Sequence, residues 1–412
     1  MSVSEQHCKP YPISPEPGRH SGFGDGCFSK GRAKTFFNFV NSVNFKVLWG
    51  VNAMEGRTQT GSTNWTGDWN STQFHHMLED WIEEGYMKNI FAFELGNEIY
   101  GQYGIEAKLT VDEGVDTFAE LWRVLKESFF SSIDRPKVFG VDTALDIAWV
   151  KEFLAKMKIK DPTFQLDAFT YHSYPLGAGS SDKVDEEIMD ENFNSKIYHL
   201  ANQASSFDNL PLGVWMGETG GAYNSGRNTV TNRFMSAFWY VDWMAVMAES
   251  GHKAFCRQTF VGGNYGLLQV DSNSKKMLVN PDFYGALLFK ELMVGKIYKA
   301  WNDKGNSTHQ YFAETETING KLQKTLLVIN YSHEPILFYC DEFEDFKSAT
   351  KYHLTSPNLQ SSTVMINGIE AQFKPGALRF NIADYAELVG DEKLEISGHS
   401  YVFITQATSN KK

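Results

Sequence analysis

The stretch Phe91-Ala-Phe-Glu-Leu-Gly-Asn-Glu98 runs from apolar residues typical of a buried strand into a carboxylate flanked by small and polar residues. A second stretch, Val214-Trp-Met-Gly-Glu218-Thr-Gly-Gly, repeats this design 120 residues later. In parallel β/α barrels the chemically active groups lie at the carboxyl ends of strands, where the loops meet on one open face. The two stretches therefore predict two strands of one parallel sheet, each presenting a glutamate at the same edge.

The surrounding sequence alternates short β-like runs with longer helical ones from about residue 45 to residue 260, which is typical of βα units. Apolar residues at three- and four-residue steps predict helices near 35–43, 72–84, 114–129, 147–157, 186–206 and 231–250. A closed (β/α)8 barrel needs eight strands, so we expect a TIM-type α/β barrel whose first strands are missing. The six expected strands are Phe45–Asn52, Ile90–Leu95, Lys137–Val141, Leu166–Tyr171, Gly213–Gly217 and Lys253–Phe260.

The texture changes after about residue 300 to short alternating runs, which predict an antiparallel β-sandwich. We expect three parts: an irregular segment 1–30, a barrel over 31–298 and a β-sandwich domain over 299–412. The expected sandwich strands are Thr325–Asn330, Ile336–Tyr339, Ala349–Leu354, Thr363–Ile366, Ala377–Ile382 and Tyr401–Thr405.

Composition excludes several classes of protein. The 412 residues carry a net charge of −12 with no block of Lys and Arg, so the electrostatic footprint of nucleic-acid binding is missing. No uncharged apolar run reaches the roughly 18 residues that a membrane span needs. The first twenty residues do not read as a secretory signal. Four glycosylation sequons begin at Asn64, Asn70, Asn306 and Asn330, and chance explains them equally well.

The four cysteines allow three pairings if oxidised, and their spacing is not that of a zinc site. Free buried thiols are an equally good interpretation. No metal or cofactor is expected. These cysteines are Cys8, Cys27, Cys256 and Cys340.

Paired carboxylates at strand ends have a specific chemical use. Cleavage of a glycosidic bond needs one protonated carboxyl group to assist the leaving oxygen and one ionised carboxylate. The carboxylate either attacks the anomeric carbon itself or activates a water that attacks it. A single glutamate after a strand is usually a solvated loop residue. Glu98 and Glu218 together, each at its own strand end, favour the catalytic interpretation, and Asn97 supplies an amide for a neighbouring sugar hydroxyl.

Two further strand ends carry candidate site residues. Thr170-Tyr-His172-Ser-Tyr174 brings an imidazole and a phenol to the same face, although an isolated histidine there is more often structural. The last predicted strand ends in Arg257-Gln258-Thr-Phe-Val-Gly-Gly-Asn-Tyr265, a glycine-rich loop whose N–H groups, with Arg257 nearby, could hold an anion. The alternative is a glycine turn followed by an aromatic packing residue.

Together these motifs resemble the heparanase and β-glucuronidase family of glycoside hydrolases (family 79), from about Gly31 to Gly295. The resemblance rests on the strand ends quoted above and on two further stretches, Asn41-Ser-Val-Asn-Phe-Lys-Val-Leu-Trp-Gly-Val-Asn-Ala53 and Gly263-Asn264-Tyr265. The resemblance implies a barrel with the acid/base at Glu98 and the nucleophile at Glu218, and a loop at Gly263-Asn264-Tyr265 that helps to bind a uronic acid carboxylate. Relatives carry an N-terminal segment with a signal peptide, a sandwich strand and the first barrel strands, and we expect this chain to begin after all three.

One departure concerns the residues after the nucleophile, where Tyr223-Asn-Ser-Gly226 replaces a glycine-rich turn and leaves the selectivity of the carboxylate pocket open. The resulting hypothesis is a retaining hydrolase of β-linked glucuronic acid residues in glycans or proteoglycans. By resemblance it would be extracellular, lysosomal or vacuolar, with cell-surface association left open. The alternative is a catalytically inactive truncated or carbohydrate-binding relative. The residues expected to line the sugar site are Asn97, His172, Tyr174, Tyr223, Gln258, Gly263, Asn264 and Tyr265.

Overall fold

The computed structural model describes residues 28–101, 107–129, 135–271, 273–300, 305–317, 320–373 and 379–408. The chain divides into two compact units. Unit 1 comprises the chain up to His172 together with Ser206–Glu218, and unit 2 comprises Ser173–Ser205 together with the chain from Thr219 onward. The domain boundaries expected at residues 30 and 298 stay a prediction.

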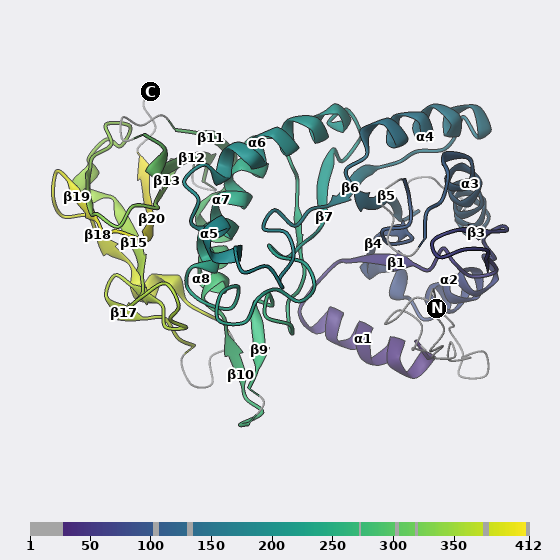
Figure 1. Ribbon diagram of the computed structural model, residues 1–412, viewed down its shortest axis with the longest axis horizontal. Coiled ribbons are helices and arrows are strands. Elements are labelled where there is room, and N and C mark those ends of the chain that lie inside the picture. The colour runs from purple at the N-terminus through teal and green to yellow at the C-terminus, as the bar shows by residue number, and fades with distance from the viewer. Residues whose placement is uncertain are drawn as a thin grey trace. The chain divides into compact units, whose positions relative to one another are not determined.

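Unit 1 is built on parallel strands that are neighbours in the sheet in the order in which they occur along the chain (Figure 1). This order places all their carboxyl ends at one edge, because each connection returns to the starting edge through a crossover. All six predicted strands of the parallel region are confirmed, although the last is short. Five of them lie in unit 1: β1 (Val47–Val51), β4 (Ile90–Leu95), β5 (Lys137–Ala144), β6 (Ala168–His172) and β7 (Val214–Thr219); the sixth, β8 (Phe255–Arg257), lies in unit 2.

Two long helices of unit 1 begin at clear capping signals. The Thr110 hydroxyl accepts from the Glu113 amide, and the Glu113 carboxylate accepts in return from the Thr110 amide, which completes a capping box at the start of α3. The Asp146 carboxylate caps α4 in the same way by accepting from Trp149 N–H. The helices are α1 (Lys30–Ser42), α2 (Thr72–Glu83), α3 (Val111–Ser128) and α4 (Ile147–Lys160), with η1 (Tyr86–Asn89) and the two-residue strands β2 (Thr58–Gln59) and β3 (Trp65–Thr66) between them.

Aromatic side chains fill the space around the parallel strands. Phe118 of α3 contacts Phe153 of α4 with ring centroids 5.0 Å apart, which joins the two helices. On the sheet itself the Trp215 ring lies 4.8 Å from Phe139 and 5.8 Å from Phe91, so β7, β5 and β4 share one cluster. Burial of side chains of this size contributes on the order of 2–3 kcal/mol each. This packing fixes the strand ends that carry the glutamates.

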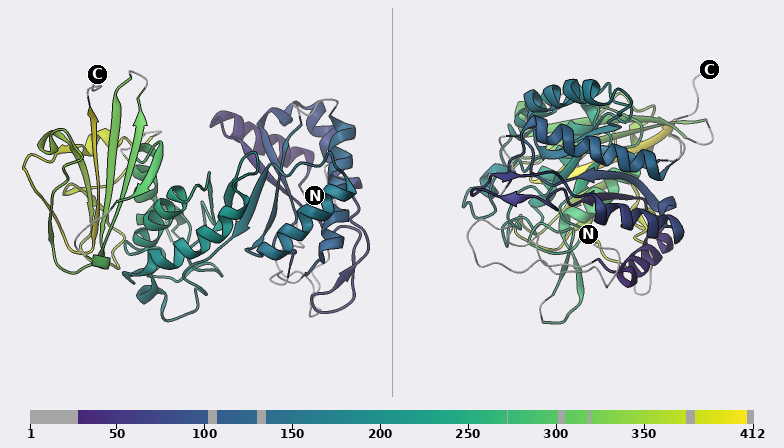
Figure 2. Two further views of the ribbon diagram at one scale, coloured as in Figure 1. Left: turned by 90° about the horizontal axis from the view of Figure 1, so that it is seen from above. Right: turned by 90° about the vertical axis from the view of Figure 1, so that its right-hand side faces the viewer.

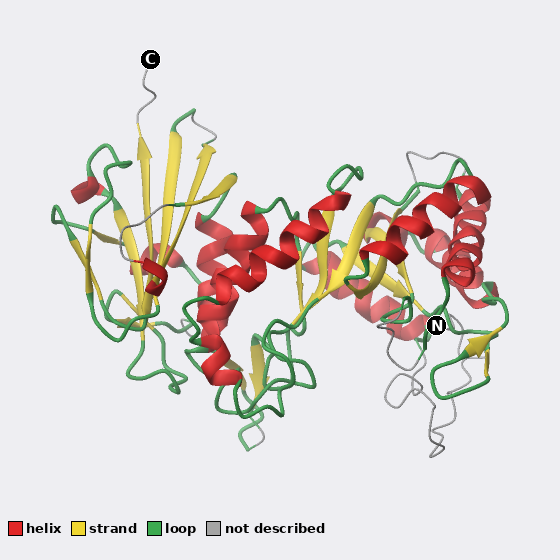
Figure 3. Ribbon diagram, turned by 45° about the horizontal axis from the view of Figure 1, so that its top comes forward, coloured by secondary structure: helices red, strands yellow, loops and turns green. Residues whose placement is uncertain are grey.

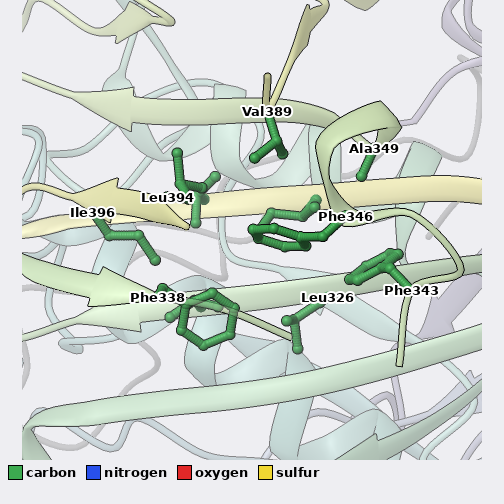
Figure 4. Close-up of a cluster of buried hydrophobic side chains, with 11 residues drawn as sticks. Leu326, Phe338, Phe343, Phe346, Ala349, Val389, Leu394 and Ile396 are labelled. Atoms are coloured by element: carbon green, nitrogen blue, oxygen red, sulfur yellow. The ribbon is translucent and has the colours of Figure 1, made fainter. Parts of the chain in front are cut away.

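Unit 2 contains an eight-stranded sheet whose pairings are all antiparallel, as expected for the C-terminal part. A two-stranded sheet, β14–β19, covers one face and shares with it a core that includes Leu326, Phe338, Phe346 and Leu394 (Figure 4). The large sheet runs in the order β11 (Lys296–Lys299), β12 (Thr308–Glu316), β13 (Leu322–Asn330), β20 (Ser400–Thr408), β15 (Thr350–Thr355), β16 (Met365–Ile366) and β17 (Ile369–Glu370), with β18 (Glu387–Leu388) on β15; the small one holds β14 (Ile336–Phe338) and β19 (Leu394–Ile396).

Helix α7 (Ser236–Glu249) is buried along nearly its whole length, which explains its apolar and aromatic sequence. It packs against α6 (Phe193–Ala204), α8 (Pro281–Leu292) and β11. The single carboxylate in its buried stretch, Asp242, accepts hydrogen bonds from His309 and Tyr311 of the large sheet and from Tyr331, which directly follows a strand of that sheet. The helices of unit 2 therefore lie beside its strands as one packed body, as the red and yellow elements of Figure 3 show.

Some predicted elements are wrong in detail. The helix expected over 186–206 is two helices, α5 (Val184–Ile188) and α6, because Asp190 accepts from Asn192 N–H in a turn between them. The strand expected over 377–382 lies partly outside the described residues, and its remainder leads into a 3₁₀ turn, η5 (Ile382–Tyr385), capped by Asn381. The hairpin of β9 (Leu268–Val270) and β10 (Met277–Val279) is not predicted at all.

Three remaining expectations concern chain chemistry. Asn330 is fully buried and its amide donates to the backbone of Glu334 and Ser397, so this sequon is structural, whereas Asn64 and Asn70 are exposed. Cys340 is a free thiol, Cys256 is partly buried in β8, and Cys8 and Cys27 lie outside the described residues. Among the helices the structure describes, none has the length and apolar character to cross a membrane.

Candidate active site

Glu98 stands in a tight turn directly after β4. Gly96 has a φ of 90° and Glu98 itself a φ of 53°, both in the left-handed region. A side chain at position 96 would meet Ile99 at 2.6 Å, so only glycine fits there. A glutamate at positive φ costs on the order of 1–3 kcal/mol, and such strain persists where the surroundings hold it. Here the Glu98 amide donates to the carbonyl of Asp142 at 2.8 Å.

Asp142 occupies an irregularity in β5. The pairing of β5 with β6 shifts register between Val141 and Thr143, and Asp142 has a φ of 56°. A shift of this kind re-aims a side chain that regular alternation would send elsewhere. The Asp142 side chain is nearly buried and turns toward His172.

His172 ends β6 and is the centre of the cluster. Its Nε2 lies 2.6 Å from Asp142 Oδ1, and its Nδ1 lies 2.8 Å from Glu98 Oε1. The imidazole side chain is only 3% exposed, so these carboxylates rather than water are its partners. The sequence predicted His172 as a site residue, and the structure brings it into direct contact with Glu98.

Glu218 lies opposite His172 in the pairing of β6 with β7. Its Oε2 is 3.9 Å from His172 Nδ1. One oxygen of Glu98, one oxygen of Glu218 and one ring nitrogen of His172 all lie within 4.8 Å of one another. Both glutamate side chains keep partial exposure, 18% for Glu98 and 24% for Glu218, whereas the histidine behind them is closed off. Two accessible carboxyl groups therefore face one space.

The charges around His172 set its protonation. Burial alone would lower the pKa of His172, but the adjoining carboxylates of Asp142, Glu98 and Glu218 outweigh it and raise that pKa well above the usual value. Glu94, fully buried on β4, has its pKa raised by burial and by the nearby Asp142. The cluster thus combines a cationic imidazole with a carboxyl group that favours the neutral form.

These residues also make up the one group of three potential ligands, within the described ranges, that is close enough to hold a metal ion. Both ring nitrogens of His172 already contact carboxylates, however. A cation would have to displace Glu98 from Nδ1, because a ligating histidine offers a free lone pair. The cluster is better suited to moving protons.

The candidate residues of unit 2 form a second group. Loops 173–181, 219–231 and 257–266 pack on one another, and the Tyr174 and Tyr223 rings lie 6.2 Å apart, edge to face. A side chain at Gly220 would meet the Gln258 carbonyl, Tyr174 and Tyr265 within 3.2 Å, so these three surround one glycine. Asn264 N–H donates to Ser225 O, which ties the Gly263-Asn264-Tyr265 loop to the Tyr223 loop. These residues lie together within unit 2, whereas Asn97, exposed beside Glu98, belongs to unit 1; that they line a sugar site stays a prediction.

Arg257 does not have the role that its position suggested. Its guanidinium is 5% exposed, pairs with the buried Asp282, and donates twice to the carbonyl of Tyr265. It also lies 4.3 Å from the centre of the Tyr240 ring. Arg257 is therefore a structural cation that fixes the loop from behind, and it is not available to bind an anion.

Sequence reasoning missed Asp142 and Glu94. Asp142 comes one residue after the end of the predicted strand Lys137–Val141, so its place at a strand end was a usable signal. Its contact with His172 depends on the register shift in β5, which no local pattern announces. Glu94 was read as part of the apolar run of β4, and its burial beside Asp142 follows only from the packed sheet.

A parallel sheet with two accessible glutamates and a histidine clustered at its carboxyl edge is the arrangement that a glycoside hydrolase needs. Comparison with known proteins agrees. Residues 1–245 match the N-terminal domain of glycosyl hydrolase family 79, and the chain belongs to that family.

Two relatives and one solved structure illustrate the likeness. The baicalin-β-D-glucuronidase of Scutellaria baicalensis is 27% identical over 93% of this chain and 73% of its own length. Heparanase-like protein 2 of Arabidopsis thaliana is 34% identical over 66% of this chain, which spans only 49% of that relative. The crystal structure of a 4-O-α-L-rhamnosyl-β-D-glucuronidase from Fusarium oxysporum, 15% identical, superposes with a TM-score of 0.65 over 90% of this chain and 79% of its own, which shows a shared fold.

Proposed function

We propose that this chain hydrolyses β-linked glucuronic acid residues with retention of anomeric configuration, with Glu98 as acid/base and Glu218 as nucleophile. The spacing of the two carboxylates carries the proposal. Retaining enzymes hold their carboxyl groups about 5–5.5 Å apart, and inverting enzymes about 6.5–9.5 Å apart to admit a water. Oxygens of Glu98 and Glu218 within 4.8 Å of each other fit the first class.

The reaction takes two balanced steps. A Glu218 oxygen attacks the anomeric carbon, the glycosidic C–O bond breaks, and the Glu98 proton passes to the leaving oxygen. A water then gives a proton to Glu98 and attacks the same carbon, the ester bond to Glu218 breaks, and the sugar leaves with its original configuration. Asn97, beside Glu98, is the proposed partner of a sugar hydroxyl next to the reacting carbon.

The finer fold and the substrate are part of the same proposal. The parallel strands of the sheet and the likeness to the Fusarium structure support a (β/α)8-type barrel with a β-sandwich. The β-glucuronidase activity for which the Scutellaria baicalensis relative is named supports a uronic acid in the reacting position. The proposed sugar-binding group in unit 2 comprises Tyr174, Tyr223, Gln258, Gly263, Asn264 and Tyr265. A secreted or vacuolar location, expected by resemblance, is proposed with it.

The test compares wild type, Glu218→Gln and Glu83→Gln on aryl β-glucuronide and aryl β-glucoside. Glu83 is an exposed residue at the end of α2, which makes it a matched control. We expect turnover of the glucuronide in wild type and in the control, a loss of at least about a thousandfold in Glu218→Gln, and NMR detection of the β-anomer as first product. A folded wild-type protein that turns over neither substrate would support the inactive or binding-only alternative instead.

A further inference from the structure

Asp142 is a charged residue of this cluster that neither catalytic step uses. Its side chain contacts His172, and its backbone contacts Glu98. Its side chain reaches His172 Nε2 at 2.6 Å, and its backbone carbonyl accepts from the Glu98 amide at 2.8 Å. Asp142 and Glu98 are both held at positive φ. The contacts therefore link the backbone of Glu98, the ring of His172 and the end of β5.

We propose that Asp142 is a positioning residue for the acid/base: through His172 it keeps an N–H donor opposite Glu98 and retains the proton that Glu98 must deliver. This inference rests on the proposed function and goes beyond it, because it assigns the supply of the proton to a three-member chain, Asp142–His172–Glu98. The Nε2–H donated to Asp142 fixes the orientation of the ring, which leaves Nδ1 facing Glu98.

Charge explains why the chain needs Asp142. His172 is faced by Asp142 from β5, by Glu98 from the turn after β4, by Glu218 from β7, and more distantly by Glu94 from β4. When Glu98 has given its proton to the leaving oxygen, an imidazolium beside it stabilises the new carboxylate. Asp142 lies on the opposite side of the His172 ring from Glu98 and stabilises that imidazolium. Because the ring is buried, water does not replace its contact with Asp142 or with Glu98.

The leaving group offers a readout that a merely structural role would not change. A phenolate leaving group of high pKa needs the proton from Glu98, whereas 2,4-dinitrophenolate leaves without it. Asp142→Asn keeps the shape and can still accept from Nε2–H, but it removes the charge. We expect kcat/KM for phenyl β-glucuronide to fall at least about tenfold more than kcat/KM for the dinitrophenyl substrate.

The pH profile gives a second readout with a definite sign. Asp142's negative charge raises the affinity of the His172–Glu98 pair for its protons, so removing the charge lowers the pKa of the alkaline limb. We expect that limb of kcat/KM to move down by about one pH unit. Asp146→Asn is the matched control: Asp146 caps α4 four residues away, and asparagine is an equally good cap.

A measurement without substrate separates this inference from the proposed function. In ¹⁵N NMR of labelled histidine, His172 of wild type should stay doubly protonated at pH 7, whereas in Asp142→Asn it should titrate at least about one unit lower. An inactive wild type that shows this difference would overturn the proposed function but support the chain of contacts. Equal losses on both substrates with an unmoved alkaline limb, or an unchanged His172 titration, would overturn the inference.

Discussion

Gly217 allows a direct test of the site geometry, because its lack of a side chain leaves room for Asp142 and His172. A Cβ at this position would lie 2.9 Å from Asp142 Oδ1, 3.2 Å from Thr170 Cβ and 3.5 Å from His172 Cδ2. Ordinary contacts of a carbon with these atoms start near 3.4 Å. Gly217→Ala therefore forces Asp142 to shift by about half an ångström or to turn away from His172.

The expected effect is on activity more than on folding. A displacement of about 1 Å at a reacting group can cost around a hundredfold in rate, so a half-ångström shift should cost about tenfold in kcat/KM. Overpacking of this size should also lower the free energy of unfolding by about 1–3 kcal/mol. The assay is hydrolysis of an aryl β-glucuronide together with thermal unfolding of the same preparation.

Gly50 provides the matched control. It is also a strand glycine of unit 1, in β1, and a Cβ there would meet nothing within 4 Å. Gly50→Ala should keep full activity and melt within a few degrees of wild type. A Gly217→Ala variant with the same kcat/KM as Gly50→Ala would refute the claim that the Asp142–His172 contact must stay in place.

Other predictions concern buried titratable groups and modification. Asp242→Asn should destabilise the protein by about 3–5 kcal/mol because it breaks a buried ion pair with His309. Burial lowers the pKa of His309, but Asp242 outweighs this effect and raises that pKa. The loss of stability should therefore be largest below pH 6.5 and shrink as the pH rises through the raised pKa of His309, which melting temperatures from pH 5 to 9 would show. Burial lowers the pKa of His252 to about 4, so stability should fall between pH 6.5 and 4, by up to about 3 kcal/mol, and His252→Gln should flatten this slope in acid unfolding curves. In protein from a secretory eukaryotic host, mass spectrometry should find glycan at Asn64 or Asn70 and none at Asn330, whose buried amide is already bonded; occupancy at Asn330 would contradict the described packing.

The strands of unit 1 could be predicted because a parallel sheet buries both faces, and this leaves near-continuous apolar runs in the sequence. The ends of β4 and β7 were equally readable, because glycine and carboxylate follow directly on those runs. Glu98, Glu218 and His172 were therefore placed together from sequence alone. Element ends were less accurate, as for the helix over 186–206, because a local Asx turn at Asp190 competes with helix propagation.

The rest of the site depends on tertiary geometry. Asp142 reaches His172 because β5 shifts register by one residue, and that shift is set by neighbouring strands rather than by local preference. Arg257 was misread for the opposite reason. A cation beside a glycine-rich loop predicts anion binding, but Asp282 lies 25 residues further along the chain and takes up its charge in the interior.

Helix α7 also limits how the protein can be dissected. Its Phe238 contacts Tyr331 and Tyr401 of the large sheet, and its Asp242 is neutralised by that sheet. A shorter product that stops before residue 299 would expose this aromatic surface to water and leave Asp242 without its three partners. We therefore expect such a product to aggregate. We also expect intact unit 2 to melt in a single calorimetric transition. The sequence change near residue 300 would then mark a change of architecture inside one cooperative folding unit.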